Sequence, residues 1–197
     1  MALILVRHGR TSANAAGLLQ GHVDNPLDPL GMLQAQAIAA ALQGLDRPRV
    51  VSSPLLRARQ TAAALQLPVE IDERFIELDY GGLDGVPTRE VDAALWARWR
   101  ADADFVPAGG ESLAGLQARV EQACGDLAAD AGGRDVVVFS HVSPIKAAVA
   151  WALGVSGPAT SWRMNLGQAT ITRIRTAPGN PALMVFNSDT HLSGLEN

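Results

Sequence analysis

Short apolar runs alternate with helix-like segments along this chain, and this alternation restricts the fold more than any other feature. Residues 3–6, 50–51 and 136–139 are entirely apolar, and each run is followed, directly or after a loop, by apolar residues at helical spacing. Continuous apolar runs are typical of strands buried on both faces of a parallel sheet. The alternation therefore predicts an α/β fold with three layers, α/β/α, around a mostly parallel central sheet.

The expected strands cover residues 3–6, 49–52, 136–139, 169–175 and 182–186, and an extended segment covers 69–76 with Val69, Ile71 and Phe75 facing inward. One expected helix opens at Asp28-Pro29, and others cover 55–65, 87–100, 113–129 and 143–154. Only a short turn with Pro and Gly separates the last two strands, which predicts an antiparallel hairpin at one edge of the sheet. This hairpin offers a pairing surface for a homodimer.

Composition limits the classes of protein to which the chain can belong. Its 197 residues suit a single domain spanning 1–197. A net charge of −4 argues against non-specific nucleic-acid binding, which uses a basic surface. No apolar stretch approaches the roughly 18 residues of a membrane helix, and there is no signal-peptide core, so the expected location is the cytoplasm without membrane association. The single cysteine, Cys124, lies among apolar residues at helical spacing and is expected in the core.

Polar residues follow the predicted strands at the points where these strands end. Arg7-His8-Gly9 follows the first strand, Arg57 follows the second strand after residues 52–54, and His141 follows residues 136–139. The carboxyl ends of strands in an open α/β sheet border its ligand site. Arginine forks suit phosphate oxygens, and an imidazole can act as a nucleophile or a base. We therefore expect these residues to converge, although periodicity alone does not show that they meet.

A carboxylate is expected in the same site, and the chain offers several. Glu73, Glu77, Asp79 and Asp84 lie close together in the sequence, and spacing alone does not choose among them. Other polar residues have simpler interpretations. Arg59 is expected on a helix surface, and His22 and His191 are expected in loops, with His22 near the mouth of the site.

Further short blocks stand in a defined order along the chain. They are Leu5 to Asn14, Leu19-Gln20-Gly21, Pro26-Leu27 with Gly31 and Gln34-Ala35, Ser52 to Leu55 with Arg57-Ala58 and Gln60-Thr61-Ala62, Glu77 with Gly81, Gly109 to Ser112, and Ser140-His141. This ordered set resembles the histidine phosphatase superfamily, in the branch that also contains the cofactor-dependent phosphoglycerate mutases. The resemblance runs from residue 3 to about residue 153, and Asn187 to Leu192 is similar to the family's end.

The resemblance implies a role for each catalytic residue. His8, in the Arg7-His8-Gly9 motif, is the expected nucleophile and forms a phosphohistidine, which requires a neutral ring whose other nitrogen donates to a fixed acceptor. Arg7 and Arg57 are expected to hold the phosphate, with a charged His141 beside its oxygens. Glu77 is selected as the general acid that protonates the leaving alcohol and later activates water.

The resemblance also implies how the substrate, a small phosphorylated molecule, is held. The expected substrate-binding residues are Gly9, Thr11, Asn14, Gln20, Gly21 and Val142, with Asn14 donating a hydrogen bond to the phosphate. No metal and no cofactor are expected, because side chains supply the cations and no cluster with metal-ligand spacing occurs. A small helical cap at about 84–108 is expected to carry Trp96 and Trp99, mainly as core residues, with one of them also facing the leaving group.

Several departures from the mutase pattern favour a phosphatase. Mutases of this family resemble Glu-Arg-His-Tyr-Gly after the acid, whereas this chain has Leu78-Asp79, and it lacks the longer insertion with paired arginines that grips a second phosphate. The run from Val142 to Lys146 resembles phosphatases related to the α-ribazole phosphatase group, and Arg10 replaces the usual Glu or Gln. We therefore expect a metal-independent phosphatase of small phosphomonoesters. The alternatives are a cofactor-dependent phosphoglycerate mutase and a catalytically weak, phospho-ligand-binding regulatory protein.

Overall fold

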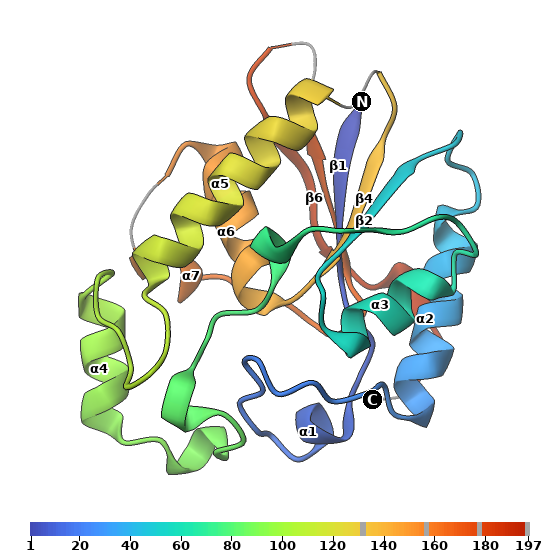
Figure 1. Ribbon diagram of the computed structural model, residues 1–197. Helices are drawn as coiled ribbons and strands as arrows, with labels where there is room; N and C mark the ends of the chain where they lie inside the picture. The colour runs from blue at the N-terminus through green and yellow to red at the C-terminus, as the bar shows by residue number, and fades with distance from the viewer. Residues whose placement is uncertain (131–132, 156–157, 177–178, 196–197) are drawn as a thin grey trace.

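The computed structural model describes residues 1–130, 133–155, 158–176 and 179–195. Its described strands form one sheet in the order β3-β2-β4-β1-β5-β6. They are β1 (Ala2–Arg7), β2 (Arg49–Ser52), β3 (Glu70–Ile71), β4 (Val136–Ser140), β5 (Ile171–Arg175) and β6 (Ala182–Ser188). The first four run parallel, whereas β5 pairs antiparallel with both β1 and β6. The predicted parallel sheet with an antiparallel hairpin at its edge is confirmed (Figure 1).

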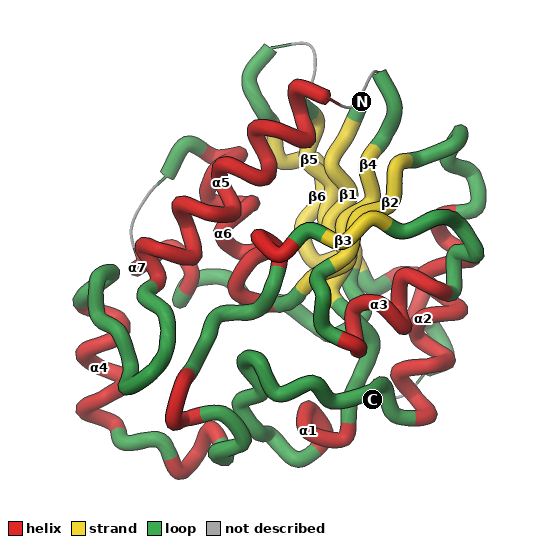
Figure 2. The backbone as a smooth tube through the Cα atoms, viewed as in Figure 1, coloured by secondary structure: helices red, strands yellow, loops and turns green. Residues whose placement is uncertain are grey.

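Helices cover both faces of this sheet, as the sequence predicts (Figure 2). The helices are α1 (Ser12–Ala15), α2 (Pro29–Leu42), α3 (Leu56–Ala63), α4 (Ala93–Ala101), α5 (Leu113–Asp130), α6 (Val142–Leu153) and α7 (Pro158–Ser161). Helices α2 and α3 lie on one face and α5 and α6 on the other (Figure 1). Within the described part of the chain, no helix is long and apolar enough to cross a membrane.

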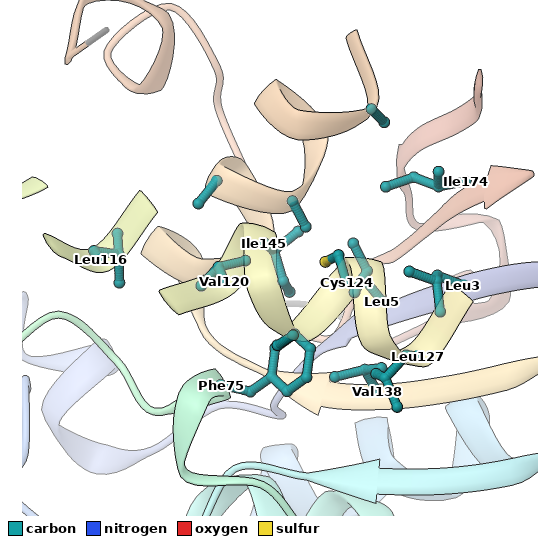
Figure 3. Packing of buried hydrophobic residues seen from close by; sticks show 14 of the residues in the cluster. Leu3, Leu5, Phe75, Leu116, Val120, Cys124, Leu127, Val138, Ile145 and Ile174 are labelled. Carbon is teal, nitrogen blue, oxygen red and sulfur yellow. The ribbon is translucent and has the colours of Figure 1, made fainter. Parts of the chain in front are cut away.

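The alternation of side chains along β1 divides the core into two halves. Leu3 and Leu5 join the cluster under α5 and α6, whereas Ile4 and Val6 join the cluster under α2 and α3. Both faces of β1 are therefore buried, which explains its unbroken apolar run. Figure 3 shows the first cluster, where Cys124 packs among aliphatic side chains. The prediction for Cys124 is confirmed, and burial raises the pKa of its thiol to about 12, which leaves it inert.

Three boundary predictions are corrected by the structure. The extended segment at 69–76 contains only the two-residue strand β3 and then a 3-10 turn at Glu73–Phe75, so Phe75 is buried but Ile71 at the sheet edge is 50% exposed. The helix expected at 87–100 is a 3-10 turn at Thr88–Glu90 followed by α4, whose first turn is capped by the Asp92 side chain. Helix α6 begins at Val142, with His141 rather than Ser143 at its N-cap.

Candidate active site

The residues expected to converge do meet at the carboxyl edge of the parallel strands. His8 follows β1, Arg57 lies on α3 after β2, and His141 follows β4. The His8 and His141 rings are 5.1 Å apart between centroids. A pocket of about 290 Å³ is lined by predicted residues and by others that the sequence did not single out. The lining comprises Arg7, His8, Asn14, Gly17, Leu18, Leu19, Gln20, Gly21, Arg57, Glu77, Tyr80, Thr88, Val142 and Gln168.

The His8 ring is held in the form that a nucleophile requires. Its Nδ1 lies 2.7 Å from the Gly9 carbonyl oxygen, which can only accept, so Nδ1 carries the proton and Nε2 keeps its lone pair. The backbone is fixed on both sides, since the His8 N–H donates to the Ser140 carbonyl at 3.0 Å and its carbonyl accepts from Ala169 at 3.1 Å. Burial, followed by the charges of Arg57 and Arg7, holds the pKa of His8 well below its usual value. The ring is therefore neutral at pH 7.

Arg57 is buried, with only 1% of its surface exposed, and every nitrogen of its guanidinium is engaged. It donates to the carbonyls of Gly21 and Val23, each at 2.8 Å, and through Nε to His141 Nδ1 at 3.2 Å. Arg57 therefore ties the 21–23 loop to the second histidine. Burial lowers the pKa of this guanidinium, which nonetheless stays charged at neutral pH.

The hydrogen bonds of His141 are those of a neutral ring, whereas the expectation of a charged ring concerns the complex with phosphate and stays a prediction. Because Arg57 can only donate, His141 Nδ1 must accept, and the proton lies on Nε2, which donates to Ser53 Oγ at 2.7 Å. Burial and then the Arg57 charge hold the pKa of His141 well below its usual value. His141 is fully buried behind the pocket rather than in its lining, and the positive charges of Arg57 and Arg7 lie near its ring.

Arg7 presents a buried donor without a partner among the described residues. Its Nη1 donates to the Leu166 carbonyl at 2.6 Å, but its Nε has no acceptor. Burial lowers the pKa of Arg7 to about 10, so it stays charged at pH 7. A buried N–H left unpaired costs about 1–3 kcal/mol. An anion in the pocket would supply the missing acceptor.

The Glu77 carboxylate sits at the N-terminus of α6 and is 6% exposed. Its Oε1 accepts from the backbone N–H groups of Leu78 at 2.8 Å and Ser143 at 3.1 Å, and its Oε2 accepts from Val142 at 3.1 Å. Of the four carboxylates that the sequence left open, Glu77 alone lines the pocket. Asp79 instead accepts from Gly81, and Asp84 accepts from the His22 backbone.

The expected substrate-binding residues divide into two groups. Asn14, Gln20, Gly21 and Val142 line the pocket, whereas Gly9 and Thr11 do not. Gly9 is needed for packing, because a Cβ there would lie 2.5 Å from the Gly31 carbonyl oxygen. The Thr11 backbone N–H donates to Asn14 Oδ1 at 3.1 Å, and its hydroxyl donates to Gln20 Oε1 at 2.9 Å. Thr11 thereby orients two amides and leaves their NH₂ groups available to donate.

A clamp behind Glu77 was missed by the sequence analysis. Arg119 on α5 forms a two-pronged ion pair with Glu111 at 2.7 and 2.8 Å and donates to the carbonyls of Arg74 at 2.6 Å and Glu77 at 3.2 Å. His22 Nε2 also lies 3.0 Å from the Glu77 carbonyl oxygen. Nothing in the spacing of Arg119 distinguishes it from an ordinary surface arginine. Glu111 lies in the Gly109 to Ser112 block, and this block was the only indication in the sequence that Glu111 belongs near the site.

Replacing Arg119 with Met is expected to lower the free energy of unfolding by about 1–3 kcal/mol, because two carbonyls and the Glu111 carboxylate lose their donor. Urea denaturation followed by circular dichroism measures this change. The matched control is Arg89→Met, since Arg89 is exposed and pairs with Glu90 at 3.7 Å on the surface. A loss no greater than that of the control would show that the clamp is dispensable.

The donor chemistry of the site is that of an anion pocket. Among the described residues, no group of three or more His, Cys, Asp or Glu side chains is placed to hold a metal ion. Fold and site together define an α/β protein with two neutral histidines, two arginines and one carboxylate at the carboxyl edge of its sheet. This arrangement is typical of an α/β protein that binds an anion at the carboxyl edge of its sheet.

Comparison with known proteins gives the family. The model of the histidine phosphatase superfamily, branch 1, matches residues 3–189, and the chain belongs to this family. A glucosyl-3-phosphoglycerate phosphatase from Mycolicibacterium vanbaalenii is 37% identical over 190 residues, covering 89% of this chain and 83% of the relative. An adenosylcobalamin/alpha-ribazole phosphatase from Salmonella typhimurium is 32% identical over 197 residues, covering 95% and 96% respectively.

Solved structures agree with these sequence relatives. Phosphoserine phosphatase from Entamoeba histolytica, in complex with 3-phosphoglyceric acid, superimposes with a TM-score of 0.89 at 30% identity and covers 97% of this chain and 98% of its own. These relatives are phosphatases, as the resemblance in the sequence predicts. The predicted family and its phosphatase-type branch are confirmed.

Proposed function

We propose that this chain is a metal-independent phosphatase that hydrolyses small phosphomonoesters through a phosphohistidine on His8. The observation that carries the proposal is the hydrogen bond from His8 Nδ1 to the Gly9 carbonyl, which leaves Nε2 free to attack. Arg7 and Arg57 supply positive charge beside it. The phosphatase relatives support hydrolysis of a phosphate monoester as the reaction.

In the first step, the His8 Nε2 lone pair forms a bond to phosphorus while the bond from phosphorus to the alcohol oxygen breaks. Glu77 gives its proton to the departing oxygen. Arg7, with its unpaired Nε–H, and the Asn14 amide stabilise charge on the equatorial oxygens. Arg57 adds its charge to the same pocket and keeps the His141 ring oriented.

In the second step, water attacks phosphorus, Glu77 takes a proton from that water, and the N–P bond breaks so that His8 regains its lone pair. The backbone N–H groups that hold the Glu77 carboxylate keep it at one place for both proton transfers. Residues 84–108 act in this proposal as a small cap over the site. Helix α4 lies away from the sheet and contacts α7 (Figure 1).

The proposed function is tested by phosphate release from p-nitrophenyl phosphate in the presence of EDTA, with His8→Ala as the background. Release well above that background is the expected result. No release by a well-folded wild-type protein would favour the phospho-ligand-binding alternative. Addition of 2,3-bisphosphoglycerate tests the mutase alternative, because conversion of 3- to 2-phosphoglycerate faster than hydrolysis would overturn the assignment as a phosphatase.

Replacing Glu77 with Gln is expected to slow the enzyme in proportion to the basicity of the leaving group. An alkyl phosphate needs the proton and should lose about 100- to 10,000-fold in kcat, whereas p-nitrophenolate leaves without protonation and that substrate should lose much less. Steady-state kinetics on the two substrates measure the difference. Equal losses on both would remove Glu77 from the role of proton donor.

A further inference from the structure

A second pocket of about 160 Å³ adjoins the candidate active site. Its lining comprises Leu78, Tyr80, Trp96, Trp99, Leu113, Val142, Ser143, Lys146, Ser161 and Trp162. Tyr80 and Val142 line both pockets, so the two share a boundary. The catalytic steps described above use no residue from the far part of this second pocket. Its place beside the phosphate-binding residues suits the part of a substrate that leaves as the alcohol.

The far wall of this pocket is aromatic. Trp96 stacks on Trp99 with 5.8 Å between ring centroids, and Trp162 meets Trp96 edge-on at 5.6 Å. Trp99 is 1% exposed and belongs to the core, whereas Trp162 is 37% exposed. Large flat side chains of this kind bury apolar groups and stack with other rings. An apolar, planar part of a ligand would therefore be accommodated against Trp96 and Trp162.

Among the described residues that line this pocket, Lys146 is the one with a charged side chain, and it is the only lysine in the whole sequence. It lies one helical turn beyond Val142 on α6, which places both on the same face. The side chain is half-buried and forms no hydrogen bond or ion pair with any described residue. Burial lowers the pKa of its ammonium, the Glu77 charge partly offsets this effect, and the Arg7 charge adds to it. A half-buried cation without a partner favours an anionic ligand.

One of the tryptophans that line this pocket carries a buried donor without an acceptor. Trp99 Nε1 is buried and has no hydrogen-bond partner within the described part of the chain. Buried indole N–H groups normally find one. Lys146 supplies one full positive charge, and the hydroxyls of Tyr80, Ser143 and Ser161 in the lining are neutral donors. One cation with neutral donors matches a group with a single negative charge and two acceptor atoms, which is a carboxylate. A phosphate dianion is held by several cations or charge-assisted donors, and this pocket supplies one.

We infer that Lys146 determines substrate specificity by pairing with a carboxylate on the alcohol part of the phosphomonoester, whose apolar portion packs against Trp96 and Trp162. The inference rests on the proposed function and extends it by naming the substrate class. The carboxylate lies a few bonds from the ester oxygen, since Lys146 is about one helix turn from the boundary of the catalytic pocket.

The test compares matched substrates on matched variants. Phenyl phosphates that carry a carboxylate at the meta or para position are compared with their neutral carboxamides. The wild type is expected to prefer one carboxylate isomer about tenfold in kcat/KM, mainly through KM. Lys146→Met should abolish this preference, Lys146→Arg should keep part of it, and Arg59→Met, on an exposed part of α3, should keep all of it. An equal preference in the wild type and in Lys146→Met would overturn the inference.

Two further experiments, one with a bisphosphate substrate and one that observes Lys146 directly, test whether the pocket binds a carboxylate. A phenyl bisphosphate preferred over the carboxylate would show that the pocket takes a second phosphate instead. Reductive ¹³C-methylation labels only Lys146 and the N-terminal amine, because the sequence has no other lysine. Saturating 3- or 4-hydroxybenzoate should shift the Lys146 signal, and no shift with either compound would count against the carboxylate site. If no ester is hydrolysed above the His8→Ala background, the proposed function fails, and this signal still tests the pocket.

Discussion

His8→Ala is expected to lower kcat for p-nitrophenyl phosphate by about 100,000-fold, since removing a nucleophile that works as a unit with its neighbours costs about that much. The structure gives the reason in this protein. The His8 ring is neutral, its Nδ1 proton is fixed on the Gly9 carbonyl, and its Nε2 is the reactive nitrogen. Alanine leaves the arginines in place, so the variant should still bind inorganic phosphate.

Rapid-quench kinetics and ³¹P NMR test this prediction in the wild type and in the His8→Ala variant. The wild type should accumulate an acid-labile, base-stable phosphoryl-protein during turnover, and His8→Ala should form none. Its thermal unfolding should stay close to that of the wild type if folding is intact. Turnover by His8→Ala within tenfold of the wild type would exclude His8 as the phosphoryl acceptor.

Arg57→Met is expected to lower kcat/KM by about 1,000-fold, the loss typical of removing one preorganised charged donor from an active site. Three contacts disappear together, to the Gly21 carbonyl, the Val23 carbonyl and His141 Nδ1. The variant therefore loses the positive charge and also loosens the 21–23 loop. Arg59→Met on the same helix is the control, because Arg59 is exposed, as the sequence predicts.

The same substitution should change the histidine pKa values in a known direction. The Arg57 charge is the second largest cause, after burial, that lowers the pKa of His8 and of His141. Its removal should raise both pKa values toward the ordinary 6.5. As the pH is lowered, His8 should then become protonated and lose its reactive neutral form at a higher pH than in the wild type. The protein has four histidines, so ¹⁵N-histidine NMR can follow each titration. Unchanged values in Arg57→Met would show that burial alone sets them.

Much of the fold follows from local patterns in the sequence. The strand at 3–6 is apolar on both faces because both faces of β1 are covered, and the position of the hairpin at 169–186 follows from its short turn. Residue types at strand ends predicted His8, Arg57 and His141, because parallel strands bring their carboxyl ends to one edge. The inward orientation predicted for Ile71 was wrong, because β3 is an edge strand of two residues and neither of its faces is buried. The alternation of residues within the segment does not show that the strand lies at the edge of the sheet.

The sequence by itself determined the α/β alternation, the strands that carry the site and the residue types within it, because these depend on periodicity and on neighbours along the chain. Only the tertiary structure decided which carboxylate faces the pocket, that burial and Arg57 lower the pKa of His141, and that Lys146 shares a pocket with three tryptophans. Each of these depends on contacts between residues far apart in sequence, such as the hydrogen bond from Arg57 to His141. Burial and charge at a site are sums over such neighbours, and they exist only once the chain has folded.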